Sequence, residues 1–268
     1  MPNNEFHIDG LVLTESASKA YHQVVGWDAK SEFIHPCYLH CLAFPLHLML
    51  LLLPEFPLPL LGLVHVDNQI KQFRAIKKDE KLDLRSSFGE LALHPKGWLF
   101  SINVEFFSGS DLVWQSTSTN FFRAKHGRTV EPVNSSLLQD LIYPINKAWD
   151  LNTNLGRRYA KVSGDYNLIH LHKWSAKLFG FKQHVIHGMW TKSTCVSILH
   201  QVNPALFSDA FTINTTFKQP IYLPSQVNMA VELYEPNGVH HEQNFKVVGG
   251  EDGNHQPSLH LTGNICAI

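Results

Sequence analysis

Residues 38–53 read YLHCLAFPLHLMLLLL and form the most apolar stretch of the chain. A helix that is apolar on every side has to be buried. Its core, residues 41–53, is 13 residues long and contains Pro45 and His47, whereas a bilayer span needs about 20 apolar residues. The stretch therefore predicts a buried helix and not a membrane segment.

Four segments with strand-like patterns follow this helix. The alternation is clearest at Phe100, Ile102, Val104 and Phe106, as in a strand with one buried face. The four predicted strands are residues 63–70, 81–88, 97–107 and 111–123. One buried helix followed by consecutive strands with short turns predicts an α+β fold, in which an antiparallel sheet wraps around a central helix.

The second half of the chain repeats this plan. Residues 188–202 have helical apolar spacing and stop at Asn203-Pro204, and predicted strands cover 211–217, 227–233, 242–248 and 259–265. The shared order predicts a tandem duplication. We expect an N-terminal repeat at 1–125, a linker at 126–147 containing Pro132 and Pro144, and a C-terminal repeat at 148–268.

The composition narrows the class of protein. The chain has 268 residues, 44% hydrophobic residues and a net charge of −1, so it can bury a sizeable core and lacks the basic excess of a nucleic-acid-binding protein. Its four cysteines form no CxxC pair, which favours reduced thiols over a disulfide framework. The N-terminus has no basic patch followed by an apolar stretch, so we expect no secretory signal and a cytoplasmic location.

Chemistry is concentrated in residues 159–176, YAKVSGDYNLIHLHKWSA. Asp165 and His170 are five residues apart, a spacing that brings the two side chains together only if the backbone between them bends. Gly164 and Asn167 permit such a bend. A carboxylate and an imidazole that converge can hold one water and move its proton.

A second motif, VIHGMW at residues 185–190, lies where the C-terminal helix is predicted to begin. The first N–H groups of a helix have no intrahelical partner, and Gly188 lets a substrate carbonyl approach the backbone. An N–H aimed at an oxygen that gains charge acts as an oxyanion hole. His187 either packs and caps at this helix start or takes a direct part in catalysis.

Together SGDYNLIH and IHGMW resemble the MaoC-like dehydratases, also called type 2 enoyl-CoA hydratases. The resemblance covers about residues 148–268 and departs from the family pattern at Leu168, where proline is usual. It implies a double hot-dog fold with one site per chain. Asp165 and His170 are then catalytic, Gly188 donates to the thioester carbonyl, and Gly164, Asn167 and His187 shape the site.

The implied reaction is reversible hydration of a trans-2-enoyl thioester to an (R)-3-hydroxyacyl thioester, a hydro-lyase reaction of fatty acid metabolism without a cofactor. The group that carries the acyl chain as a thioester, called the handle below, is coenzyme A or acyl carrier protein. Two such chains, each an internal pseudo-dimer, can pair into a homodimer. A hot-dog thioesterase and a non-catalytic acyl-thioester binding module are the alternatives. A metal site at His170-Leu171-His172 or His184-x-x-His187 is disfavoured, because no carboxylate or cysteine completes either pair in the sequence.

Overall fold

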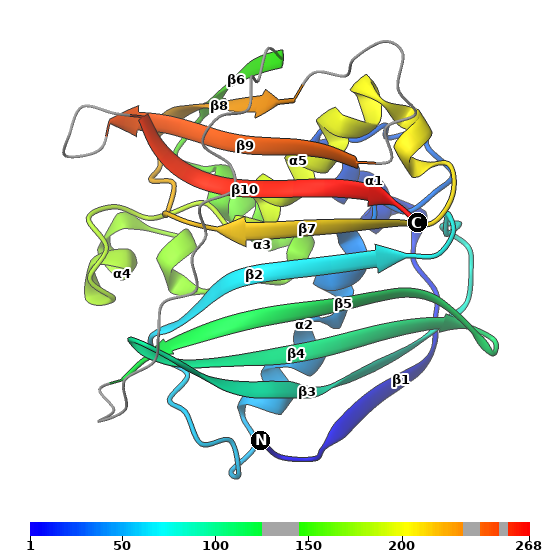
Figure 1. Ribbon diagram of the computed structural model, residues 1–268, viewed down its shortest axis with the longest axis horizontal. Coiled ribbons are helices and arrows are strands. Elements are labelled where there is room, and N and C mark those ends of the chain that lie inside the picture. The colour runs from blue at the N-terminus through cyan, green and yellow to red at the C-terminus, as the bar shows by residue number, and fades with distance from the viewer. Residues whose placement is uncertain (125–144, 233–241, 252–256) are drawn as a thin grey trace.

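The computed structural model describes residues 1–124, 145–232, 242–251 and 257–268. Its ten strands form one continuous antiparallel sheet in the order β1-β3-β4-β5-β2-β7-β10-β9-β8-β6 (Figure 1). In the first half the strands are β1 (Glu5–Leu11), β2 (Leu63–Gln72), β3 (Leu82–His94), β4 (Gly97–Ser108) and β5 (Asp111–Arg123). In the second half they are β6 (Ile145–Leu151), β7 (Phe211–Phe217), β8 (Ser225–Val231), β9 (Glu242–Glu251) and β10 (Pro257–Ala267).

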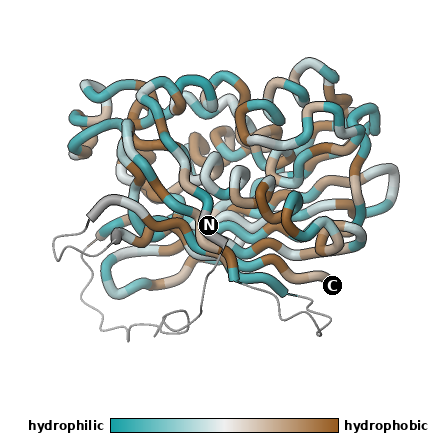
Figure 2. The backbone as a smooth tube through the Cα atoms, turned by 90° about the horizontal axis from the view of Figure 1, so that it is seen from above, coloured by the Kyte–Doolittle hydropathy of each residue, from teal (hydrophilic) through white to brown (hydrophobic). Residues whose placement is uncertain are grey.

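The helical segments gather on one side of this sheet, as the view from above in Figure 2 shows. In the first half they are α1 (Glu15–Val25) and α2 (Tyr38–Leu51). In the second half they are α3 (Leu155–Ser163), η1 (Leu168–His170), α4 (Lys173–Leu178), α5 (Gly188–Val202) and η2 (Pro204–Phe207), where η marks a 3₁₀ helix. Within the described residues, no helix combines the length and the apolar character needed to cross a membrane.

The two halves repeat one strand order. Counted from either outer edge toward the middle, the strands run first, third, fourth, fifth and second of their own half. The two second strands, β2 and β7, pair antiparallel in the middle of the sheet, with Ile70 opposite Ile213. Both isoleucines are fully buried, so the join between the halves lies inside the core.

The helices α2 and α5 are the central helices of their halves. On α2 the apolar side chains Leu39, Ala43, Leu46 and Leu50 are buried, whereas Leu48 and Met49 are 40% and 47% exposed, so the helix is not buried on every side, contrary to the sequence prediction. α5 begins at Gly188, after His187 in an extended conformation, and ends before Asn203-Pro204 because proline cannot continue the hydrogen-bonded helix there. Each half is thus an antiparallel sheet with a central helix, as the sequence predicted.

Two further features of the prediction needed correction. Among the described residues each half has five strands and not four, because β1 and β6 precede the helices and form the two outer edges of the sheet. The short strand β1, EFHIDGL, and the helix α1 were missed because both carry few apolar residues at regular spacing. Most of the predicted linker, 126–147, falls outside the described residues, so the repeat boundaries stay predictions.

Candidate active site

Asp165 lies just beyond the end of α3. Gly164 terminates the helix with φ of 77°, a left-handed conformation that glycine adopts without strain. The Asp165 N–H donates to Ser163 Oγ at 3.2 Å, and Asp165 Oδ1 accepts the N–H of Asn167 at 3.0 Å. These bonds make the bend that the motif predicted, and they leave the carboxylate 26% exposed.

His170 ends η1 with its ring buried. Its Nδ1 lies 2.8 Å from the carbonyl oxygen of Val185, and because a carbonyl only accepts, Nδ1 carries the proton. Nε2 therefore keeps its lone pair. Asn167 supports this position, since its side-chain oxygen accepts the N–H of Ile169 at 3.4 Å at the start of η1.

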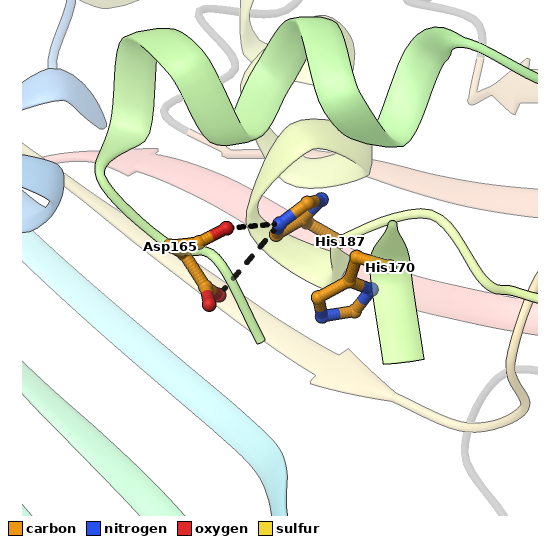
Figure 3. A group of neighbouring side chains, drawn as sticks. All are labelled: Asp165, His170 and His187. Atoms are coloured by element: carbon orange, nitrogen blue, oxygen red, sulfur yellow. Dashed lines mark hydrogen bonds and ion pairs between the residues drawn. The ribbon is translucent and has the colours of Figure 1, made fainter. Parts of the chain in front are cut away.

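His187 packs against both predicted catalytic residues (Figure 3). Its Nε2 donates to the backbone oxygen of Asp165 at 3.0 Å and lies 3.8 Å from the Asp165 carboxylate. Its ring stacks on that of His170 with centroids 3.7 Å apart, and the Tyr159 ring lies 4.9 Å away on a tilted plane. His187 therefore positions the loop and the second imidazole.

Burial keeps both imidazoles neutral. It lowers the pKa of His170 from its ordinary value, although the Asp165 charge and the Val185 hydrogen bond act in the opposite direction. Burial, with a smaller contribution from His170, lowers the pKa of His187 well below its ordinary value. At neutral pH the site thus presents a partly exposed carboxylate beside two uncharged rings.

Gly188 is the first residue of α5, so its N–H has no partner within the helix. A Cβ at this position would lie 2.9 Å from two ring atoms of Phe217, closer than real side chains approach. Glycine therefore leaves the backbone accessible where a side chain would be forced against Phe217. All six predicted site residues lie at the two ends of the connection between α3 and α5. They are Gly164, Asp165, Asn167 and His170 at one end and His187 and Gly188 at the other.

The same geometry also forms a possible metal site. One ligand atom each from Asp165, His170 and His187 lies within 4.8 Å of the others. The sequence argument that no carboxylate completes a set with these histidines was wrong, because the loop folds Asp165 back against His187. The His187 Nε2–H that points at the Asp165 backbone oxygen would have to turn away before that nitrogen could bind a metal.

Two supporting residues were not found from the sequence. A Cβ at Gly156 on α3 would lie 2.1 Å from the backbone oxygen of His170, so glycine allows the close approach of α3 to η1. Lys192 on α5 is fully buried and donates from Nζ to Asn68 O at 2.9 Å, Asn68 Oδ1 at 2.6 Å and Ile213 O at 3.3 Å. Burial lowers the pKa of Lys192 to about 8. A lysine in the otherwise apolar and small-residue run MWTKSTCVSIL was the available signal.

Comparisons with known proteins identify a similar family and a similar relative. A family model described as "MaoC like domain" matches residues 125–254. The 3-hydroxyacyl-thioester dehydratase X of Mycobacterium tuberculosis is 27% identical over 231 residues, which cover 86% of this chain and 81% of the relative.

Solved structures share the architecture. The crystal structure of HtdX from M. tuberculosis superposes with a TM-score of 0.78 at 24% identity, over 99% of this chain and 100% of that chain. A MaoC-like dehydratase from Phytophthora capsici has a TM-score of 0.78 at 18% identity, over 100% and 96% of the two chains. A further M. tuberculosis protein described as a double hot-dog fold has a TM-score of 0.66 at 11% identity, over 100% and 96%. The chain thus contains a MaoC-like domain at residues 125–254 and has the double hot-dog fold of these solved structures.

Proposed function

We propose that this enzyme adds water reversibly to a trans-2-enoyl thioester and forms the (R)-3-hydroxyacyl thioester. The observation that carries the proposal is the arrangement of two proton acceptors beside a helix start. The Asp165 carboxylate and the lone pair of His170 Nε2 belong to side chains held at one place, and the Gly188 N–H begins the adjoining helix.

The two acceptors suit a single water molecule. A water that donates one hydrogen bond to the Asp165 carboxylate and the other to His170 Nε2 directs its oxygen lone pairs away from both, toward a substrate. Asp165 removes a proton from the water as its oxygen bonds to C3 of the enoyl group. His170 holds and polarises the same water.

The remaining steps move the C2–C3 π electrons of the substrate and return the proton that Asp165 took from the water. As the bond from oxygen to C3 forms, the C2–C3 π electrons move toward the thioester carbonyl, whose oxygen becomes an enolate. The Gly188 N–H donates to that oxygen at the positive end of the α5 dipole. Asp165 returns its proton to C2, so one water has been added and the enzyme is restored.

The site favours this reaction over its two alternatives. A thioesterase would direct the water at the carbonyl carbon, whereas in the proposed reaction the Asp165–His170 pair directs it at C3, two carbons further along the acyl chain. A non-catalytic binding module would tolerate a broken pair, yet the carboxylate and the imidazole are both present and each is fixed by hydrogen bonds. The name of the M. tuberculosis relative, a 3-hydroxyacyl-thioester dehydratase, points the same way.

The test is to incubate the purified protein with crotonyl thioesters of coenzyme A and of acyl carrier protein. We expect loss of enoyl absorbance, no release of free thiol, and a product that chiral analysis identifies as the (R)-3-hydroxybutyryl thioester. Thiol release in step with substrate loss would identify a thioesterase. Binding of both thioesters without conversion would identify a binding module.

A further inference from the structure

The surface beside the active site combines exposed apolar side chains with positive charge. Trp174 is 68% exposed, Leu178 is 84% exposed, Tyr166 is 57% exposed and Leu168 is 49% exposed. We call these four residues the apolar patch. All four lie within 13 residues of the chain, whereas exposed apolar side chains usually occur singly.

The apolar patch borders the catalytic residues directly. Tyr166 follows Asp165, and Leu168 begins the 3₁₀ helix that ends at His170. Ser175 Oγ donates to the backbone oxygen of Leu168 at 2.7 Å and so fixes α4 against η1. In Figure 1, α4 lies at the left, beyond the ends of the central strands, where a partner can reach it.

Two lysines lie against Trp174 of the apolar patch, and further basic residues are close to it in the chain. The Nζ atoms of Lys173 and Lys177 lie 5.3 Å and 5.2 Å from the centre of the Trp174 ring. Arg157 Nη1 donates to Leu171 O at 2.9 Å, which places a third cation next to η1. Arg158, Lys161 and Lys182 are exposed nearby in the chain. Between residues 155 and 182 these six cations accompany one acidic residue, Asp165, although the whole chain has 22 basic and 23 acidic residues.

We propose that the apolar patch and its lysines dock a small acidic protein that carries the substrate as a thioester on a phosphopantetheine arm. The inference rests on the proposed function, since a thioester needs a handle and this surface adjoins the site where the thioester reacts. A nucleotide handle would use one aromatic face and a few cations for its phosphates. Four exposed apolar side chains with two lysines beside them instead match an acidic amphipathic helix, whose apolar residues cover Trp174 and Leu178 while its carboxylates meet Lys173 and Lys177.

The test compares three crotonyl thioesters that differ only in the handle: an acyl carrier protein, coenzyme A and pantetheine. The variants are Trp174→Ala and the charge reversal Lys173→Glu/Lys177→Glu, with Lys96→Glu as the control on an exposed turn of the other half. We expect the charge reversal to lower kcat/KM at least 10-fold for the carrier protein substrate and to leave the pantetheine substrate within 2-fold of wild type. Trp174→Ala acts in the same direction, since exposed aromatic anchors concentrate binding energy.

The other outcomes overturn the proposal in distinct ways. A loss confined to the coenzyme A substrate would show that this surface binds nucleotide phosphates. Equal losses on all three substrates would show that the substitutions disturb the catalytic loop. Unchanged values on all three would show that the surface has no docking role. If wild type hydrates none of the three, including the pantetheine thioester that needs no docking, it is the proposed function itself that fails.

Discussion

The α3–α5 connection and the α1–α2 connection occupy equivalent places in the two halves of the sheet. Each follows a helix that ends at a glycine with positive φ, Gly164 in one half and Gly26 in the other. Each then turns at an aspartate whose Oδ1 accepts the N–H two residues later, at 3.0 Å for Asp165 and 2.9 Å for Asp28. A glycine helix end followed by an aspartate turn is therefore present in both halves, with Asp165 directly after Gly164 and Asp28 two residues after Gly26.

The histidines of the two connections differ. In the C-terminal half His170 and His187 stack against each other beside the aspartate. In the N-terminal half His35 faces the core, with its Nε2 3.2 Å from Ser193 O, and α2 begins at Tyr38 where α5 begins at a glycine. We propose that a similar turn yields a reactive site only where a second acceptor and an accessible helix start accompany the carboxylate.

The N-terminal half uses its polar groups to brace the catalytic helix. Tyr21 Oη and Ser193 Oγ are 2.7 Å apart, and Trp190 Nε1 donates to Val24 O at 3.0 Å. With His35 on Ser193 and Lys192 on Asn68, these bonds attach successive turns of α5 to the other half. We infer that one half performs the chemistry and the other holds its helix in place.

The largest expected difference between the two halves comes from replacing His170 and His35 separately with glutamine. Each variant loses a buried hydrogen bond, so each should lower the free energy of unfolding by about 1–3 kcal/mol. Only His170→Gln should also lower kcat, by roughly 10²–10⁴-fold, because it removes an acceptor for the water. An equal loss of kcat in His35→Gln would show that the N-terminal half takes part in the chemistry.

A smaller kinetic effect is expected at the helix start. Gly188→Ala places a Cβ against the Phe217 ring, so either the ring or the helix start must move and the N–H no longer points at the thioester oxygen. We expect kcat/KM to fall by about 10–100-fold, less than for complete loss of an oxyanion donor. Adding Phe217→Leu should restore part of the activity. If the double variant is no better than Gly188→Ala, the contact with Phe217 is not the cause.

Lys192→Met tests the brace itself. The variant keeps the apolar stem but leaves Asn68 Oδ1 and two backbone carbonyls without their donor, so it should destabilise the protein by about 3 kcal/mol in urea unfolding. Lys19→Met, an exposed lysine on α1, is the control and should change the unfolding free energy by less than about 0.5 kcal/mol. Equal effects would contradict a bracing role for Lys192.

A further expected effect is acid sensitivity from histidines buried in the N-terminal half. Burial lowers the pKa of His47 to about 4 and that of His65 to about 3. Below pH 6.5 these imidazoles are protonated in the unfolded chain but stay neutral in the folded protein. The free energy of unfolding therefore falls with decreasing pH until the pKa of the folded state is reached. Each group contributes about 1.4 kcal/mol per pH unit in that window. His47→Gln should make the decline between pH 6.5 and 4.5 shallower, whereas an unchanged slope would exclude His47 as a contributor.

Much of the fold followed from apolar periodicity. The bounds of α5, β5 and β7 agree with the predicted ranges because each segment has a clear period and ends at a turn, a proline or a glycine. The elements α1 and β1 escaped because their inward-facing residues include Ser18 and His22 and because β1 lies at the sheet edge. Periodicity does not register polar residues that are buried through tertiary hydrogen bonds.

The sequence predicted the site residues that lie within its two motifs, but not the contacts that those residues make with other segments. Apolar spacing predicted the helix start at Gly188, and Gly164 and Asn167 indicated that the backbone can bend, whereas the pairing of Asp165 with His170 was implied by the family resemblance. The stacking of His187 on His170, the close approach at Gly156 and the reach of Lys192 across the β2–β7 join depend on how separate segments pack. These contacts join residues of different segments, so the spacing of residues within one segment does not predict them.

The measurement that tests the central claim most directly is kcat for hydration of a crotonyl thioester by Asp165→Asn and Asp28→Asn. Both substitutions change one carboxylate to an amide at the same kind of turn, one in each half. Our account predicts that Asp165→Asn loses at least 100-fold in kcat while Asp28→Asn stays within 2-fold of wild type, with circular dichroism confirming that both are folded. Unchanged turnover in folded Asp165→Asn, or an equal loss in Asp28→Asn, would contradict it.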